Sequence, residues 1–126
     1  DNDWVSVAGE GRAGVGSCVR VADSGTGNRV MTGPDGVRWT SRSSAADNDW
    51  TSVAWGGPAG AETFVAVAYS GTGNRVMTSP DGVTWTLQTS AADNNWVSVT
   101  WGGPAGSEKF VAVAYSGTGN RVMTSP

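Results

Sequence analysis

Apolar and polar positions alternate in short segments along the chain, most clearly between residues 48 and 89. Residues 48–55 (NDWTSVAW) carry spaced apolar side chains, whereas residues 63–69 (TFVAVAY) form a continuous apolar run that is typical of a strand buried on both faces. Residues 75–79 (RVMTS) follow, and then residues 83–89 (VTWTLQT), in which every second residue up to Leu87 is apolar and shares one face. The intervening GGPAGAE, SGTGN and PDG favour tight turns. We therefore predict four short strands and no helix.

The same pattern occurs three times with a period of 46 residues and no gaps. The first two copies are identical at 31 of 46 positions, and the third matches the second at 29 of 34. A fixed period of this length indicates a repeat architecture, and a four-stranded meander in each copy is typical of a β-propeller blade. The predicted fold is all-β, with blades at residues 1–46, 47–92 and 93–126, or about 2.75 blades.

The predicted blades do not make a closed ring by themselves, because propellers contain about 4–8 blades. The third blade ends before its fourth strand. We expect the ring to be completed either by self-association, as a homodimer with six blades, or by the rest of a longer chain. The start at Asp1 without a methionine and the stop inside a repeated motif favour the longer chain.

The turn before the fourth strand carries a motif that resembles a known family. SPDGVTW at residues 79–85 resembles the Asp-box of sialidase-type propellers, which reads Ser-x-Asp-x-Gly-x-Thr-Trp, although Gly82 follows Asp81 directly. GPDGVRW at residues 33–39 is a second, weaker match. The resemblance implies a folding element in which the Asp holds the turn and the Trp packs between sheets. By this resemblance the structural residues are Asp35, Asp81, Trp39 and Trp85.

Composition excludes several classes of partner. The net charge is -3 with no basic cluster, which argues against nucleic acid. No run of about 18 apolar residues is present, so we expect no membrane span. The chain has no histidine and one cysteine, Cys18, so we expect no cofactor and no internal disulfide. The compartment stays open, with an extracellular setting as the compositional guess.

Candidate binding residues gather at one end of the predicted blades, where the SGTGN hairpins and the linkers between copies meet. An Asn-Arg pair from each hairpin and an indole suit a glycan or another surface ligand, or else the Trp packs in the core and the Arg bonds backbone carbonyls. The candidate ligand-binding residues are Asn28, Arg29, Asn74, Arg75, Asn120, Arg121 and Trp50. Asp47 and Asp49 are a weak calcium candidate, for which we prefer ordinary turn chemistry and no metal.

Catalysis is not favoured by the sequence. The sialidase resemblance implies an arginine triad, a Tyr nucleophile and an Asp acid, but Tyr69 and Tyr115 lie in buried-looking strand sequence and no irregular loop departs from the repeat. We predict a non-enzymatic binding or scaffold module, with glycan or surface recognition as the preferred role. The alternatives are a fragment of a propeller hydrolase and an architectural repeat of a larger surface or phage-tail protein.

The first copy differs from the others at positions expected to be buried. Gly9, Cys18 and Arg20 stand where the second copy has Trp55, Phe64 and Ala66. Either a terminal repeat has drifted, or its face is adapted to another neighbour with Arg20 paired to a carboxylate such as Asp23.

Overall fold

The computed structural model describes residues 1–9 and 17–125, and these form three antiparallel β-sheets without a helix. It follows that no membrane-spanning helix occurs in the described ranges. Sheet 1 contains β1 (Trp4–Gly9), β2 (Cys18–Ala22), β3 (Val30–Gly33) and β4 (Thr40–Arg42). Sheet 2 contains β5 (Trp50–Gly56), β6 (Thr63–Ala68), β7 (Val76–Ser79) and β8 (Thr86–Gln88). Sheet 3 contains β9 (Trp96–Gly102), β10 (Lys109–Ala114) and β11 (Val122–Thr124).

Each sheet is a simple meander built from one 46-residue repeat, because every strand pairs with the next strand in sequence. The register repeats as well: Trp50 pairs with Ala68 and Trp96 with Ala114. In all three sheets the pairing shifts by one residue just after the first Trp of the first strand, as between Trp50 and Ser52. Such an irregularity bends the strand locally. The repeat in sequence is therefore a repeat in backbone geometry.

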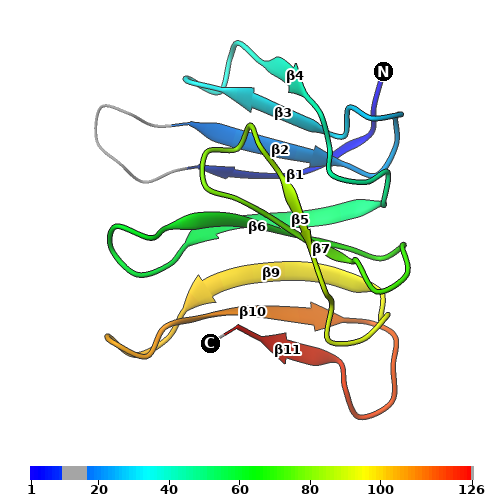
Figure 1. Cartoon of the computed structure of the whole chain (residues 1–126), viewed down its shortest axis with the longest axis vertical. Helices are drawn as coiled ribbons and strands as arrows, with labels where there is room; N and C mark the ends of the chain where they lie inside the picture. The colour runs from blue at the N-terminus through cyan, green and yellow to red at the C-terminus, as the bar shows by residue number, and fades with distance from the viewer. Residues whose placement is uncertain (10–16, 126) are drawn as a thin grey trace.

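The three sheets stack in sequence order, with β1, β5 and β9 following one another through the stack (Figure 1). One apolar cluster lies between sheets 1 and 2 and a second lies between sheets 2 and 3. We call these contacts the first junction and the second junction. Trp50 and Trp96 are fully buried, one in each cluster, and their indole N–H groups donate to the carbonyls of Ala46 and Ala92. Burial of a hydrophobic face against the next sheet stabilises the stack.

Strand β6 has the burial that its apolar sequence predicts, with Phe64–Ala68 buried throughout. The fourth strand is shorter than predicted, because residues 83–85 belong to the preceding turn. The Asp81 carboxylate holds the N–H groups of Val83 and Thr84 there. As a result Trp85 is buried while Val83 is 42% and Leu87 36% exposed, so the predicted common apolar face of these residues is wrong.

Sheet 1 replaces an aromatic cluster with a different arrangement. In sheet 2 the ring of Phe64 lies 4.5 Å from that of Trp55 and 6.4 Å from that of Trp85. In sheet 1 the guanidinium of Arg20 lies over the rings of Trp39 and Trp4, at 5.0 and 5.5 Å. Arg20 is thus held by cation–π contacts, which explains how a charged residue is accommodated on β2.

Candidate functional site

The SGTGN hairpins are held by the first residues of their own repeat. In sheet 2 the Asn48 side-chain amide, which is buried, donates to the backbone carbonyl of Asn74 at 2.9 Å and to its side-chain oxygen at 3.2 Å. The backbone N–H of Asp49 donates to Ser70 Oγ at 2.8 Å. Gly71 has φ +107°, and a Cβ there would lie 2.5 Å from the Asn48 amide nitrogen, so this turn requires glycine. Hydrogen bonds therefore join the hairpin and the linker at one end of the sheet.

The hairpin of sheet 1 also binds the start of sheet 2. The N–H of Gly27 donates to Asp47 Oδ1 at 2.7 Å. Arg29 Nη1 donates to Asp49 Oδ1 at 2.8 Å and to the carbonyl of Asn48 at 3.0 Å, while Nε donates to the carbonyl of Gly25 at 2.8 Å. We call this set of contacts the first latch. It joins two sheets through one guanidinium whose side chain is only 13% exposed.

The second junction has the same arrangement one repeat later, which we call the second latch. The N–H of Gly73 donates to Asp93 Oδ1 at 2.7 Å. Arg75 Nη1 donates to Asn95 Oδ1 and to the carbonyl of Asn94, both at 3.0 Å. The geometry is conserved between the two junctions, but Asn95 replaces a carboxylate with a neutral amide. Repetition of the contact shows that it is a property of the repeat.

Several of the candidate ligand-binding residues therefore bond other parts of the chain in this fold. Arg29 and Arg75 are 13% and 14% exposed and bonded in the latches, and the buried Trp50 indole has no free face for stacking on a sugar. In the third copy, Arg121 is exposed and donates through Nε to the carbonyl of Gly117 at 2.7 Å. The structure brings together Asn28 with Asn2, Asn74 with Asn48 and Asn120 with Asn94. A ligand role for these residues stays a prediction.

Asp47 and Asp49 serve as hydrogen-bond acceptors of the first latch. Within the described ranges, no group of three or more His, Cys, Asp or Glu side chains is placed to hold a metal ion. Each carboxylate instead faces an N–H donor: Gly27 for Asp47 and Arg29 for Asp49. Sequence analysis did not pair these carboxylates with the arginine of the preceding hairpin. The recurrence of DN(D/N) and SGTGNR with one common period was the available signal.

The two tyrosines are more exposed than the sequence suggested. Tyr69 and Tyr115 are 36% and 61% exposed, because β6 and β10 end at Ala68 and Ala114 and each tyrosine lies just beyond. The charge of Asp49 raises the pKa of the Tyr69 hydroxyl. Desolvation of the hydroxyl and its hydrogen bond with Asp49 raise this pKa further. Asn95 donates to the Tyr115 hydroxyl at 3.0 Å. The expectation of buried tyrosines is wrong, and both rings border the latch residues.

The turn before the fourth strand is organised by one aspartate. Asp81 Oδ1 accepts from the N–H groups of Val83 and Thr84 at 2.8 and 2.9 Å, and these bonds lower the pKa of the carboxyl. The Trp85 indole N–H donates to the carbonyl of Gly82 at 2.8 Å. In sheet 1, Asp35 binds the N–H groups of two residues in the same way, and the Trp39 indole donates to the carbonyl of Gly36. Both turns are thus closed by the Asp and pinned by the Trp.

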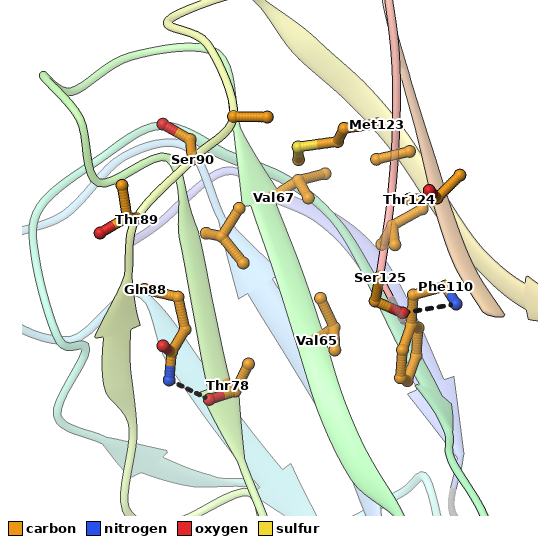
Figure 2. Close-up of a pocket in the computed structure, with 14 residues that line it drawn as sticks. Val65, Val67, Thr78, Gln88, Thr89, Ser90, Phe110, Met123, Thr124 and Ser125 are labelled. Atoms are coloured by element: carbon orange, nitrogen blue, oxygen red, sulfur yellow. Dashed lines mark hydrogen bonds between the residues drawn. The ribbon is translucent and has the colours of Figure 1, made fainter.

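A cavity of about 490 Å³ lies at the second junction, between β6 and β7 of sheet 2 and β10 and β11 of sheet 3. Val65 and Val67 of β6 line one side and Phe110 of β10 lines the other, with Met123 of β11 nearby (Figure 2). Its walls are mostly apolar side chains. The corresponding part of the first junction is occupied by the Asp81 turn.

No family model matches the chain, and neither a curated protein nor a solved structure matches it.

Proposed function

We propose that the chain is a non-enzymatic scaffold or binding module whose sheets are blades of a propeller with Asp-box-like turns. The observation that carries the proposal is the latch, which recurs at both junctions with the same donors and the same geometry. The repeated SGTGNR and DN(D/N) segments join one sheet to the next. A motif repeated for assembly is the property of an architectural module.

The two open faces of the stack carry the two halves of another junction. On the face of sheet 1, Val7 is 60% exposed, whereas its counterparts Val53 and Val99 are 5% and 7% exposed inside the junctions. On the face of sheet 3, Val113 is 43% exposed, whereas its counterpart Val67 is fully buried. Each open face therefore has apolar residues that the repeat buries elsewhere, and a further sheet fits there.

The polar groups on these faces are complementary too. Sheet 1 presents the exposed carboxylates of Asp1 and Asp3, the counterparts of Asp47 and Asp49. Sheet 3 presents the exposed Arg121, the counterpart of Arg29 and Arg75. A second copy placed head to tail completes a latch at each open face, and two copies then form a ring of six blades with two-fold symmetry. Recognition of a glycan or of a surface would use the exterior of such a ring.

The proposal is tested by the mass of the chain in solution, measured by light scattering after gel filtration. We expect a dimer of about twice the 12.9 kDa chain mass. Arg121→Glu places a carboxylate opposite Asp3 and shifts the chain to monomer; the matched control Arg38→Glu, on a turn side chain that is 82% exposed, leaves the dimer intact. Adding Asp3→Arg to Arg121→Glu restores the pair and the dimer. A monomer at all concentrations, or a dimer indifferent to Arg121→Glu, overturns the head-to-tail ring.

A further inference from the structure

The cavity at the second junction corresponds to a filled position at the first. In the first junction the turn of Asp81 and Gly82 lies against sheet 1. A Cβ added at Gly82 would lie 2.7 Å from Val19 Cγ2, 3.3 Å from Thr32 Cγ2 and 3.6 Å from Phe64 Cε2. The backbone of this turn therefore sits in direct contact with β2 and β3 of the preceding sheet, and Trp85 is buried beside it.

Moving each of these contacts forward by one repeat identifies the walls of the cavity. Val19, Thr32 and Phe64 correspond to Val65, Thr78 and Phe110. All three of the latter line the cavity. The cavity thus has the shape-determining residues of a site that, one repeat earlier, holds an Asp-Gly-Val-Thr-Trp turn.

Ser125, at the rim of the cavity, marks where such a turn begins. In sheet 2 its counterpart Ser79 accepts the N–H of Gly82 at 2.8 Å. Ser125 Oγ accepts the N–H of Phe110 at 3.0 Å (Figure 2). The neighbouring strand β11 is the outermost strand of sheet 3, whereas its counterpart β7 pairs with β8 through Val76, Met77 and Thr78. The outer edge of β11 is therefore placed to accept one more strand.

We propose that this cavity binds a peptide segment with the chemistry of residues 81–88, Asp-Gly-Val-Thr-Trp-Thr-Leu-Gln. The glycine lies against Val65 and Thr78, the indole fills the apolar cavity beside Phe110, and the following residues add as an antiparallel strand to β11. Backbone hydrogen bonds give such strand addition its affinity, and the indole pocket gives it specificity. The site is at the second junction, so the proposal does not rest on the dimeric ring.

The test uses the 126-residue chain and a nine-residue peptide, DGVTWTLQT, copied from residues 81–89 and carrying 5-fluorotryptophan. We expect a saturable ¹⁹F shift on adding the chain, with amide shifts in the chain at Val65, Phe110 and Met123. Peptides with Trp→Ala, followed through a fluorine label at their amino terminus, or with Gly→Ala, are expected to bind at least about tenfold more weakly. The glycine variant tests the left-handed turn and its close approach to Val65.

An unchanged ¹⁹F signal, or equal binding of the variant peptides, overturns the proposal. Amide shifts confined to Val7 and Val113 also overturn it, because they place the peptide on the open faces. As a second measurement, the same nine residues are joined after Pro126, and the matched chain carries Trp→Ala within them. We expect a higher Tm for the first chain only, and equal Tm values contradict the proposed site. Light scattering on these samples reports the dimer separately.

Discussion

The two junctions share the half that lies along the first strands β1, β5 and β9, which we call the inner half. They differ in the other half, beside the later strands, which we call the outer half. Both have a latch, and both have a serine hydroxyl that accepts from the first strand of the next sheet: Ser6 from Val53 and Ser52 from Val99, each at 3.2 Å. Among the residues that the structure describes, the first junction alone has an aspartate turn with its tryptophan in the outer half, where the second has a cavity. The inner contacts therefore form whether or not the outer part is filled. We infer that the latches align the sheets and that the aspartate turn closes the outer half of the core.

The latches themselves differ by one charge. Asp49 in the first latch gives a charged partner to Arg29 at 2.8 Å, whereas Asn95 gives Arg75 a neutral one at 3.0 Å. The hydrogen-bonded geometry survives this change, so it does not depend on a carboxylate at this position, although Asp93 Oδ1 still lies 3.7 Å from Arg75 Nε. The charge of Asp49 makes the first latch more sensitive to salt, because Coulomb interactions at a partly exposed site are screened.

The largest expected effect comes from removing the buried tryptophan of either junction. Trp50→Ala and Trp96→Ala each remove a side chain with no exposed surface, and we expect a loss of about 3–5 kcal/mol in the free energy of unfolding. Urea titration followed by circular dichroism measures it. Val97→Ala, which truncates a side chain that is 38% exposed, is the control and is expected to cost well under about 1 kcal/mol. If Trp96→Ala behaves like the control, the second junction is not a stable contact.

The turn that fills the first junction is isolated by a matched pair of glycine substitutions. Gly82 and Gly36 have nearly the same φ, +78° and +75°, but a Cβ at Gly36 meets no atom within 4 Å whereas one at Gly82 meets Val19. Both changes carry the left-handed penalty of about 1–2 kcal/mol. Gly82→Ala adds a packing cost of about 1–3 kcal/mol. Equal unfolding free energies for the two variants contradict the contact between this turn and sheet 1.

Two methionine substitutions measure how much the charge difference between the latches contributes to stability. Arg29→Met and Arg75→Met each remove several hydrogen bonds at a mostly buried side chain, and we expect each to cost about 1–2 kcal/mol. The cost of Arg29→Met should shrink more between low salt and about 1 M salt, because Asp49 is charged and Asn95 is not. Thermal melts at the two salt concentrations measure this. An identical salt response in both variants would show that the Asp49 charge adds nothing.

The smallest effect is the contribution of the Asp81 turn to acid stability. Hydrogen bonds from Thr84 and Val83 hold the Asp81 pKa below its usual value. The charged form is therefore favoured in the folded state, so its stabilisation is complete above the unfolded pKa of about 4 and is lost as pH falls through the lower folded pKa. We expect the Tm difference between the wild type and Asp81→Asn to be constant above about pH 5 and to shrink below about pH 4. A Tm difference that does not change with pH would show that the charge of the Asp81 carboxylate does not stabilise the turn.

The all-β class and the positions of most strands were predictable, because a 46-residue period and the run TFVAVAY are properties of local sequence. The start of the fourth strand was not, because Asp81 accepts hydrogen bonds from the N–H groups of Val83 and Thr84 and extends the turn at the expense of the strand. Alternation of apolar residues alone carries no information about this side-chain competition.

Part of the candidate site was predictable, because Arg bonds to backbone carbonyls and a Trp packed in the core were the stated alternative to a ligand role. The hairpins and linkers do meet at one end of the sheets, where the sequence put them. Arg29 binds the carboxylate of Asp49 because sheet 2 stacks closely on sheet 1. The sequence of a single repeat does not specify this stacking. Arg20 is a similar case, since its contact with Trp4 and Trp39 needs three strands to assemble around it.

The latch also has a consequence for how the length of such a protein changes over generations. Because the donor half lies on the hairpin of one repeat and the acceptor half on the start of the next, every repeat carries both halves. Insertion or deletion of one whole unit by unequal recombination creates no unfamiliar surface, since the new neighbours recognise each other by the contacts already in use. Loss of either latch segment leaves its partner unmatched, whereas sheet 3, which has three strands, keeps both segments.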